Sequence, residues 1–154
     1  MENATKALLM AASVLIGILI ISLGINLYII IGEYVKESNK EREINEINKF
    51  NEQFLKYDGR EDLTIQDVIT ASNIALENNK SHSNYDTSIT ATKEKYYVDV
   101  YFTGNTGRDK IFNIDKSDLL RTYIEDKIKC KVSVSTVTGR VFSLEFKKME
   151  KVET

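Results

Sequence analysis

Cysteine and histidine, which often serve as nucleophile and general base, each occur once in this chain. Catalysis by a thiol needs a base within hydrogen-bond reach, and a structural zinc site needs four ligands, mostly Cys and His. His82 lies in a polar run from Asn78 to Asp86 with no second His or Cys beside it. We therefore expect His82 to be a solvated loop residue that holds no metal.

Cys130 lies in the run Lys129-Cys130-Lys131-Val132, which alternates in the manner of a half-buried strand. A buried Cys acts as a small apolar residue, and we favour this interpretation. A reactive thiol and an intermolecular bridge are the alternatives. A single Cys allows no intrachain disulfide, which fits either a cytoplasmic domain or a compartment without dedicated oxidation.

Carboxylates are numerous, but their spacing matches no catalytic or ion-binding loop. Asp86, Asp99 and Asp109 lack the spacing of a calcium loop, and no Ser lies in a nucleophile-elbow pattern. The run from Gly104 to Arg108 is not a phosphate loop, because no Lys followed by Ser or Thr comes after its second Gly. We interpret it as a hairpin turn. The chain is predicted not to be an enzyme, with no catalytic residue, cofactor, metal ion or small-molecule substrate.

The charge balance argues against a nucleic-acid partner. The chain has 21 Lys and Arg and 23 Asp and Glu, and all of them except Lys6 and Glu2 lie from Glu33 onward. That polar part is close to neutral, whereas nucleic-acid-binding domains are normally basic. The chain has 154 residues, and the part from Glu33 onward is long enough for one small domain with a modest core.

The elements that would position these residues begin with an apolar segment, Ala7 to Gly32, which carries no charge over 26 positions. As a helix this segment would be roughly 39 Å long, against about 30 Å of bilayer hydrocarbon. We predict one transmembrane helix at 7–32 after an N-terminal tail at 1–6. The segment is longer than the core of a secretory signal and is not followed by a small-x-small site, so we expect an uncleaved anchor in the lipid bilayer.

Small and polar residues within the segment predict a helix-packing interface. Ser13 and Gly17 form a small-xxx-small pair, and Gly24 follows seven residues after Gly17. Small residues let helix backbones approach closely in lipid, and Asn26 adds a polar group that prefers a protein partner. Gly and Ser are also common in any membrane span. We expect self-association or packing against partner transmembrane helices through Ser13, Gly17, Gly24 and Asn26.

A helical stalk is predicted at 33–57. Its first part, Lys36 to Glu43, has no apolar residue and should be solvated. The following residues form one apolar stripe at helical spacing, which should pack the last turns of the helix onto the head. The stripe consists of Ile44, Ile47, Phe50, Phe54 and Tyr57.

The remaining residues, 58–154, are predicted to form a small α+β head with an antiparallel sheet. A capping box at Thr64 opens a helix to about Asn78, and Asp115 caps a shorter helix to about Lys127. Four strands are expected, at 96–102, 110–114, 131–137 and 140–147. For the last two strands the predicted inward residues are Val132, Val134 and Thr136, against Phe142, Leu144 and Phe146.

Charges beside the apolar segment leave its orientation open. Lys36, Lys40 and Arg42 on the C-terminal side outnumber Lys6 on the N-terminal side, which slightly favours a cytoplasmic head. A short tail before a first span more often stays inside, however. We expect a single-pass protein of the cell membrane with an extracellular head, and keep the cytoplasmic orientation as the alternative.

An uncharged N-terminal helix that continues as an amphipathic helix into a small α+β head resembles the lollipop architecture of type IV pilins and pseudopilins. The features that carry this resemblance are the small residues at Ser13, Gly17 and Gly24 and the stripe from Ile44 to Phe54. Bacterial type IV pilins have a Glu near the start of the helix, and residues 7–32 contain no acid. The run Lys6-Ala7-Leu8-Leu9 is similar to the processing site of archaeal-type pilin precursors, which would place a cleavage before the apolar core.

Residues Phe50 to Gly59, followed by Thr64 to Val68, also resemble segments of small membrane proteins of AT-rich Gram-positive bacteria, which have no assigned activity. The resemblance to pilins implies a structural subunit, or a minor component, of a surface filament or envelope-spanning assembly that works by helix bundling. The alternative is a membrane-tethered module whose head binds a partner protein in secretion or conjugation. A cytoplasmic regulator is a third hypothesis.

Overall fold

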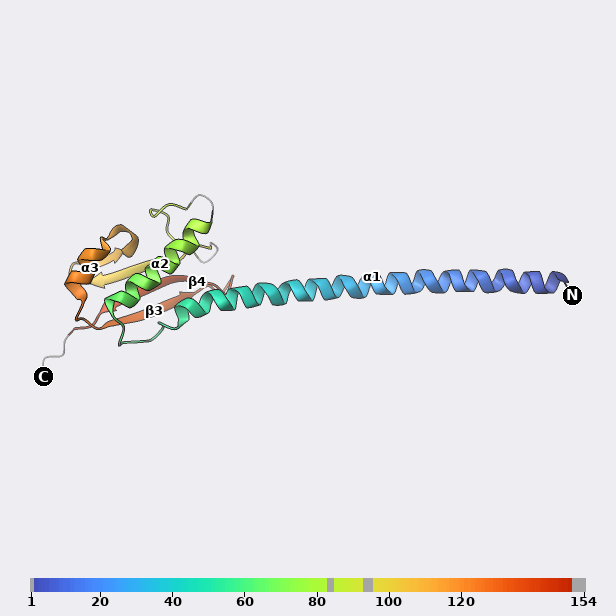
Figure 1. The fold of residues 1–154 in the computed structure, drawn as a ribbon, viewed down its shortest axis with the longest axis horizontal. Helices are drawn as coiled ribbons and strands as arrows, with labels where there is room; N and C mark the ends of the chain where they lie inside the picture. Colours follow the sequence, from blue (N-terminus) through green and yellow to red (C-terminus); the bar gives the residue numbers. More distant parts are fainter. Residues whose placement is uncertain (1, 83–84, 93–95, 151–154) are drawn as a thin grey trace. The chain divides into compact units, whose positions relative to one another are not determined.

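The computed structural model describes residues 2–82, 85–92 and 96–150. Figure 1 shows the fold, with colours that follow the sequence from the N-terminus to the C-terminus. The chain divides into two compact units, Met1–Asn45 and Glu46–Thr154, and we call the second unit the head. The head thus begins earlier than the predicted residue 58, because the last turns of the first helix pack into its core.

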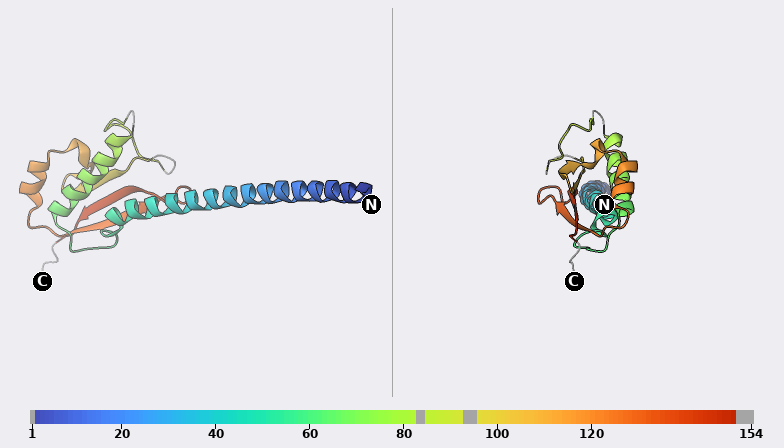
Figure 2. Two further views of the ribbon diagram at one scale, coloured as in Figure 1. Left: turned by 45° about the vertical axis from the view of Figure 1, so that its right-hand side comes forward. Right: turned by 90° about the vertical axis from the view of Figure 1, so that its left-hand side faces the viewer.

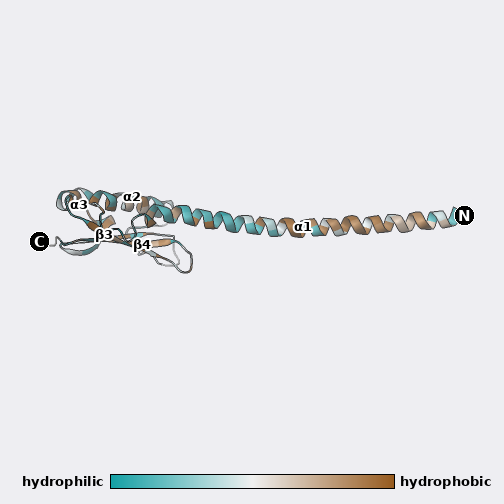
Figure 3. Cartoon of the chain, turned by 90° about the horizontal axis from the view of Figure 1, so that it is seen from below, coloured by the Kyte–Doolittle hydropathy of each residue, from teal (hydrophilic) through white to brown (hydrophobic). Residues whose placement is uncertain are grey.

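The first unit is helical throughout its described residues. Helix α1, Glu2–Leu55, begins here and includes the residues predicted as an N-terminal tail, with Lys6 paired to Glu2 at 2.9 Å. Its N-terminal part is apolar and the following part is polar, as the colours of Figure 3 show. The prediction of one apolar helix long enough to span a membrane is confirmed, and none of its apolar stretch is buried.

The head is an α+β unit in which helices cover one face of a four-stranded sheet (Figure 2). After α1 the elements are α2, Ile65–Ser81; β1, Asp99–Gly104; β2, Gly107–Lys110; the 3₁₀ helix η1, Ile111–Asn113; α3, Lys116–Tyr123; β3, Ile128–Val134; and β4, Val141–Lys148. The strands lie in the order β2-β1-β4-β3. Strands β1 and β2 are antiparallel, as are β3 and β4, but β1 and β4 are parallel. The predicted α+β class is confirmed, while the sheet is mixed because two hairpins joined through α3 meet along β1 and β4.

Both helices of the sheet face begin at the caps that the sequence predicts. Thr64 accepts a hydrogen bond from the Asp67 amide, and Asp67 Oδ2 accepts one from the Thr64 amide at 2.9 Å, which completes the capping box of α2. Asp115 accepts from the Ser117 amide at 2.8 Å, and its bonds to Ser117 lower the pKa of this carboxyl below its ordinary value. Helix α3 ends at Tyr123 rather than near Lys127, because β3 begins at Ile128.

The first hairpin differs from its prediction in position. Val98, Val100 and Phe102 are buried, as their alternation predicts. The second strand of the hairpin is Gly107–Lys110 instead of 110–114, and Ile111–Asn113 form the turn of η1. The two residues Asn105 and Thr106 therefore suffice to reverse the chain, and Gly107 supplies the positive φ of +125° that follows them.

The second hairpin contains a bulge that alternation along the sequence does not reveal. Ser133 is opposite Ser143 and Val134 is opposite Val141, so Phe142 is an extra residue on β4. An extra residue inverts the phase of every side chain beyond it. On β4 the extra residue buries Val141 in place of Phe142, whereas Val134 is the last residue of β3 and is 42% exposed, and Thr136 lies beyond the end of that strand. The predicted inward roles of Val134, Thr136 and Phe142 are wrong; the buried residues are Ile128 and Cys130 on β3, and Val141, Leu144 and Phe146 on β4.

Candidate helix-packing interface

Three of the four predicted packing residues share one face of α1. In an α-helix, residues four apart differ by about 40° and residues seven apart by about 20°, so Ser13, Gly17 and Gly24 lie nearly in line. A Cβ atom at Gly17 or Gly24 would meet no atom within 4 Å. Ser13 Oγ donates to the Met10 carbonyl at 2.8 Å, which satisfies its hydroxyl within the helix. This face of α1 therefore has open space at Gly17 and Gly24, and the hydroxyl of Ser13 on it already has a hydrogen-bond acceptor.

Asn26 lies on a different face. It follows Gly17 by nine residues, which places it about 180° around the helix, close to the direction of Ser22. The structure thus does not bring Asn26 together with the three small residues. Instead α1 presents a small-residue face and, on the opposite side, a face with two polar side chains.

The predicted stalk residues divide at the boundary between the two units. Ile44 is 57% exposed and belongs to the first unit, whereas Ile47 is half-buried and belongs to the head. Phe50 packs against the core, and Phe54 lies within it with no exposed surface. Their rings meet edge to face with centroids 5.2 Å apart. Within the head, Phe50 and Phe54 therefore carry the apolar packing of α1.

A polar residue of α1 that sequence reasoning missed binds the second hairpin. Asn51 is buried, donates through Nδ2 to the Gly139 carbonyl at 2.7 Å, and accepts through Oδ1 from the Val141 amide at 2.9 Å. It thereby satisfies two backbone groups beside the bulged strand. The signal was available, because Asn51 follows Ile47 by four residues and so lies on the apolar stripe.

Among the residues that the structure describes, Arg140 contacts aromatic rings and forms no ion pair with a carboxylate. Its guanidinium carbon lies 4.0 Å from the ring centroid of Phe50 and 5.1 Å from that of Tyr96. Burial lowers the pKa of Arg140 from its ordinary value. Tyr96 in turn stacks on His82 with centroids 5.1 Å apart, and His82 Nδ1 lies 2.8 Å from the Asn78 carbonyl oxygen. His82 is therefore a half-buried residue at the end of α2, and the expectation that it would be solvated is wrong.

The most buried charges of the head belong to an ion pair on β1 and β2. Asp99 Oδ1 lies 2.7 Å from Lys110 Nζ, and their side chains are 2% and 11% exposed. The remaining polar atoms hold one loop: Asp99 Oδ2 accepts from the Ala91 amide at 2.7 Å, while Lys110 Nζ donates to the carbonyls of Thr87 and Ile89. We call these groups the loop clamp. This cluster is not predicted from the sequence, because an acid in an alternating strand normally faces solvent.

Tyr101 completes the loop clamp from the same strand as Asp99. Its hydroxyl donates to Asp99 Oδ2 at 3.3 Å, and burial together with the Asp99 carboxylate raises the pKa of Tyr101. The contacts of the loop clamp join its side chains to one another and to backbone groups of the loop, so they hold this loop against the sheet. Over residues 2–82, 85–92 and 96–150, no group of three His, Cys, Asp or Glu side chains could hold a metal ion.

Cys130 is buried in the core on β3, as the favoured interpretation predicts. Burial, with a smaller contribution from the Asp58 charge, raises the pKa of the thiol from 9.0 to about 12. Since the thiolate is the reactive species, this environment disfavours reaction in the folded head.

We expect alkylation of Cys130 by iodoacetamide near pH 8 to be about a thousandfold slower in the folded chain than in denaturant, because the thiolate fraction falls tenfold per pKa unit. The folded form keeps the thiol protonated while the unfolded form ionises, so the free energy of unfolding should decline as the pH rises from 9 towards 12. Mass spectrometry of the alkylated chain measures the first effect. A Cys130→Ala variant should show a smaller decline; equal declines would contradict the assignment.

Comparison of the chain with protein-family models, with curated proteins and with solved structures gives no match.

Proposed function

We propose that this chain is a membrane-anchored structural subunit, or a minor component, of a pilin-like surface filament or envelope-spanning assembly. The observation that carries the proposal is the apolar stretch of α1, which is uncharged over 26 residues, has no buried residue, and is notched at Gly17 and Gly24. In this proposal α1 both anchors the chain in the bilayer and packs against other helices, and the head lies outside the cell.

The two faces of α1 favour a bundle over an isolated helix. The notches at Gly17 and Gly24 would admit the backbone of a neighbouring helix, and close packing of this kind drives association in lipid. On the opposite side, Ser22 and Asn26 offer hydrogen-bonding groups that gain about 0.6–2 kcal/mol each when a protein partner satisfies them. A helix with a packing face on each side can have two neighbours, which a repeating assembly requires and a closed dimer does not.

We expect Gly17→Leu and Gly24→Leu to abolish assembly, because each fills a notch with four carbons while meeting nothing in the isolated chain. The measurement is the amount of the chain in high-molecular-weight material sheared from intact cells. Gly32→Leu is the matched control, since the same exchange there lies about 60° away from Gly17 at the end of the segment. Shearing also tests orientation, because a cytoplasmic head would not be released.

A chain that is monomeric in detergent and indifferent to both leucine variants would contradict the proposal. That outcome would favour the alternative function, a membrane-tethered protein-binding module of a secretion or conjugation system. In that case α1 would serve only as an anchor, and recognition would reside in the head.

A further inference from the structure

The two outer strands of the sheet, β2 and β3, differ in whether other residues hydrogen-bond to their outer edges. The edge of β3 is covered by residues 58–63: Leu63 exchanges backbone hydrogen bonds with Ile128, and the Val132 amide donates to Asp58 Oδ1 at 2.8 Å. By contrast, no backbone–backbone hydrogen bond from any other described residue reaches the second edge of β2, although the Lys110 side chain at its end donates to the carbonyls of Thr87 and Ile89. An uncovered edge is a ready template for pairing with another chain.

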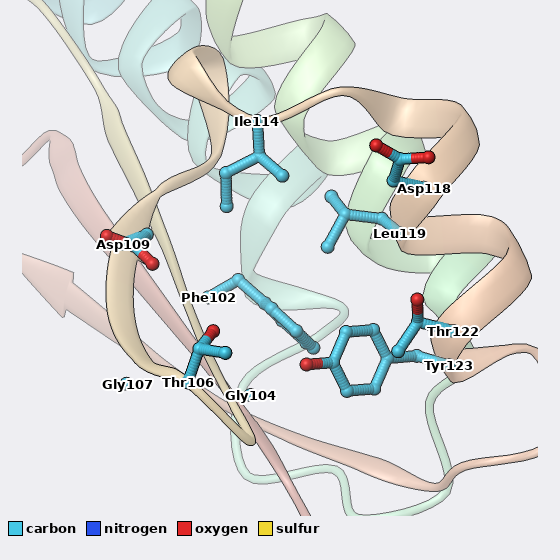
Figure 4. Close-up of a pocket in the computed structure, with 10 residues that line it drawn as sticks. All are labelled: Phe102, Gly104, Thr106, Gly107, Asp109, Ile114, Asp118, Leu119, Thr122 and Tyr123. Carbon is cyan, nitrogen blue, oxygen red and sulfur yellow. The ribbon is translucent and has the colours of Figure 1, made fainter.

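A cavity of about 250 Å³ adjoins the open edge, between the first hairpin and α3. Figure 4 shows an apolar floor, with the carboxylates of Asp109 from β2 and Asp118 from α3 on different sides of the opening. Both carboxylates are exposed, and neither has an ion-pair partner in the part of the chain that the structure describes. The floor consists of Phe102, Ile114, Leu119 and Tyr123.

Two glycines of the first hairpin, Gly104 and Gly107, line this cavity. A Cβ at Gly104 would lie 2.2 Å from the Tyr123 hydroxyl, so only Gly lets the tyrosine reach the hairpin. There the hydroxyl accepts a hydrogen bond from the Asn105 amide at 3.1 Å. Gly107, with its positive φ, places no side chain across the opening. The shape of the cavity at the hairpin therefore depends on these two glycines.

The charges of β2 oppose pairing with a second copy of itself. In an antiparallel pair, opposite residues lie on the same face, so two β2 strands whose helices share one face of the joint sheet would place Asp109 opposite Asp109 and Arg108 opposite Lys110, or Arg108 opposite Arg108. Like charges opposite each other destabilise a sheet. The charges on the open edge therefore disfavour pairing with a second copy of β2 in this arrangement. They favour a strand that has a basic residue opposite Asp109.

We propose that the open edge of β2 and the adjoining cavity bind an extended segment of a partner protein. The segment pairs with β2 through backbone hydrogen bonds, places an apolar side chain on the cavity floor, and pairs a Lys or Arg with Asp109 and Asp118. Backbone pairing supplies affinity in such strand additions, while pockets for alternate side chains supply specificity. The proposal concerns the head alone and does not depend on assembly through α1.

The test uses the full-length, isotopically labelled chain in detergent micelles and a short capped peptide in which Lys, Ile and Lys alternate with Thr. We expect saturable amide shifts in β2 and α3. Replacing Lys by Glu in the peptide should weaken binding at least about tenfold, since like charges then meet at the rim. N-methylation of the alternate residues that face β2 should abolish binding, because it removes the donors for pairing.

Variants of the chain make the test specific. Asp109→Lys should reverse the preference, so that the Glu peptide binds better than the Lys peptide, and Asp118→Lys is a second variant with the same expected direction. Glu61→Lys is the matched control, because it makes the same charge change at the covered edge of the sheet, and it should leave the preference intact. Absence of shifts in β2 and α3 with every peptide would overturn the proposal. Equal binding of all three peptides would overturn it as well.

Discussion

Replacing Asp99 with Asn is expected to lower the free energy of unfolding of the head by about 3–5 kcal/mol, the cost of leaving one buried charge without its partner. The variant keeps the size of the side chain. It leaves the Lys110 side chain, which is 11% exposed, without its counter-charge, and the single acceptor oxygen of Asn cannot serve both Lys110 Nζ and the Ala91 amide as the two oxygens of Asp99 do. Urea unfolding of the full-length chain in detergent, followed by the near-ultraviolet circular dichroism of its tyrosines, measures the loss.

A matched control lies in the same sheet. Arg108 and Glu145 form an ion pair at 2.5 Å, but their side chains are 51% and 48% exposed. Glu145→Gln should cost at most about 1 kcal/mol, because water already screens this pair. If Glu145→Gln were as costly as Asp99→Asn, burial could not be the reason for the stability of the loop clamp.

A double-mutant cycle separates the ion pair from the loop it holds. Adding Lys110→Met to Asp99→Asn removes the orphaned charge, so the double variant should be more stable than the sum of the single effects predicts. The same cycle on Arg108 and Glu145 should give a coupling energy near zero. Amide hydrogen exchange at Ala91 adds a local measurement, since its amide donates to Asp99 Oδ2.

The sequence allowed correct prediction of those features that depend on neighbouring residues. The capping box at Thr64 and the cap at Asp115 depend on side chains within three positions of the helix start. The apolar segment and the alternation of Val98, Val100 and Phe102 likewise need no knowledge of distant residues. Hydrophobic periodicity and caps therefore identified the helices and the α+β class.

The features that were missed arise from pairing between distant residues. The parallel pairing of β1 with β4 joins strands about 40 residues apart, and nothing in either strand specifies its partner. The bulge at Phe142 exists only because Val134 pairs with Val141. Asp99 is buried because Lys110 and a loop amide satisfy it, and a single strand pattern contains neither group.

The candidate packing interface shows the same division. The small residues of α1 could be found from the sequence, since spacing along one helix fixes their common face. The same geometry places Asn26 on the opposite side of the helix, because Asn26 follows Gly17 by nine residues, and this too can be predicted from the sequence. The contacts of Asn51 with the second hairpin could not be predicted from the sequence, because Gly139 and Val141 lie far from Asn51 along the chain.

Asn79→Ala is expected to lower the free energy of unfolding of the head by about 2–4 kcal/mol, because it leaves two buried backbone groups unsatisfied at about 1–3 kcal/mol each. Asn79 has no exposed surface. Its Nδ2 donates to the Val98 carbonyl at 2.8 Å, and its Oδ1 accepts from the Val98 amide at 2.7 Å. The side chain thus takes the place of a neighbouring strand at the residue before β1, which ties α2 to the sheet.

The adjacent Asn78 provides the matched control. It lies on the same helix and donates through Nδ2 to the Tyr96 carbonyl at 2.9 Å, a contact exposed to water, and to Asn79 Oδ1 at 3.2 Å, an atom that keeps the Val98 amide as its donor when Asn78 is replaced. Asn78→Ala should therefore cost less than about 1 kcal/mol, since water can replace the lost bond. Asn79→Asp keeps the acceptor for the Val98 amide and removes the donor to its carbonyl, while adding a buried charge, so it should be no more stable than Asn79→Ala. Equal losses for Asn78→Ala and Asn79→Ala in the same urea titration would show that burial of the Val98 groups is not what makes Asn79 indispensable.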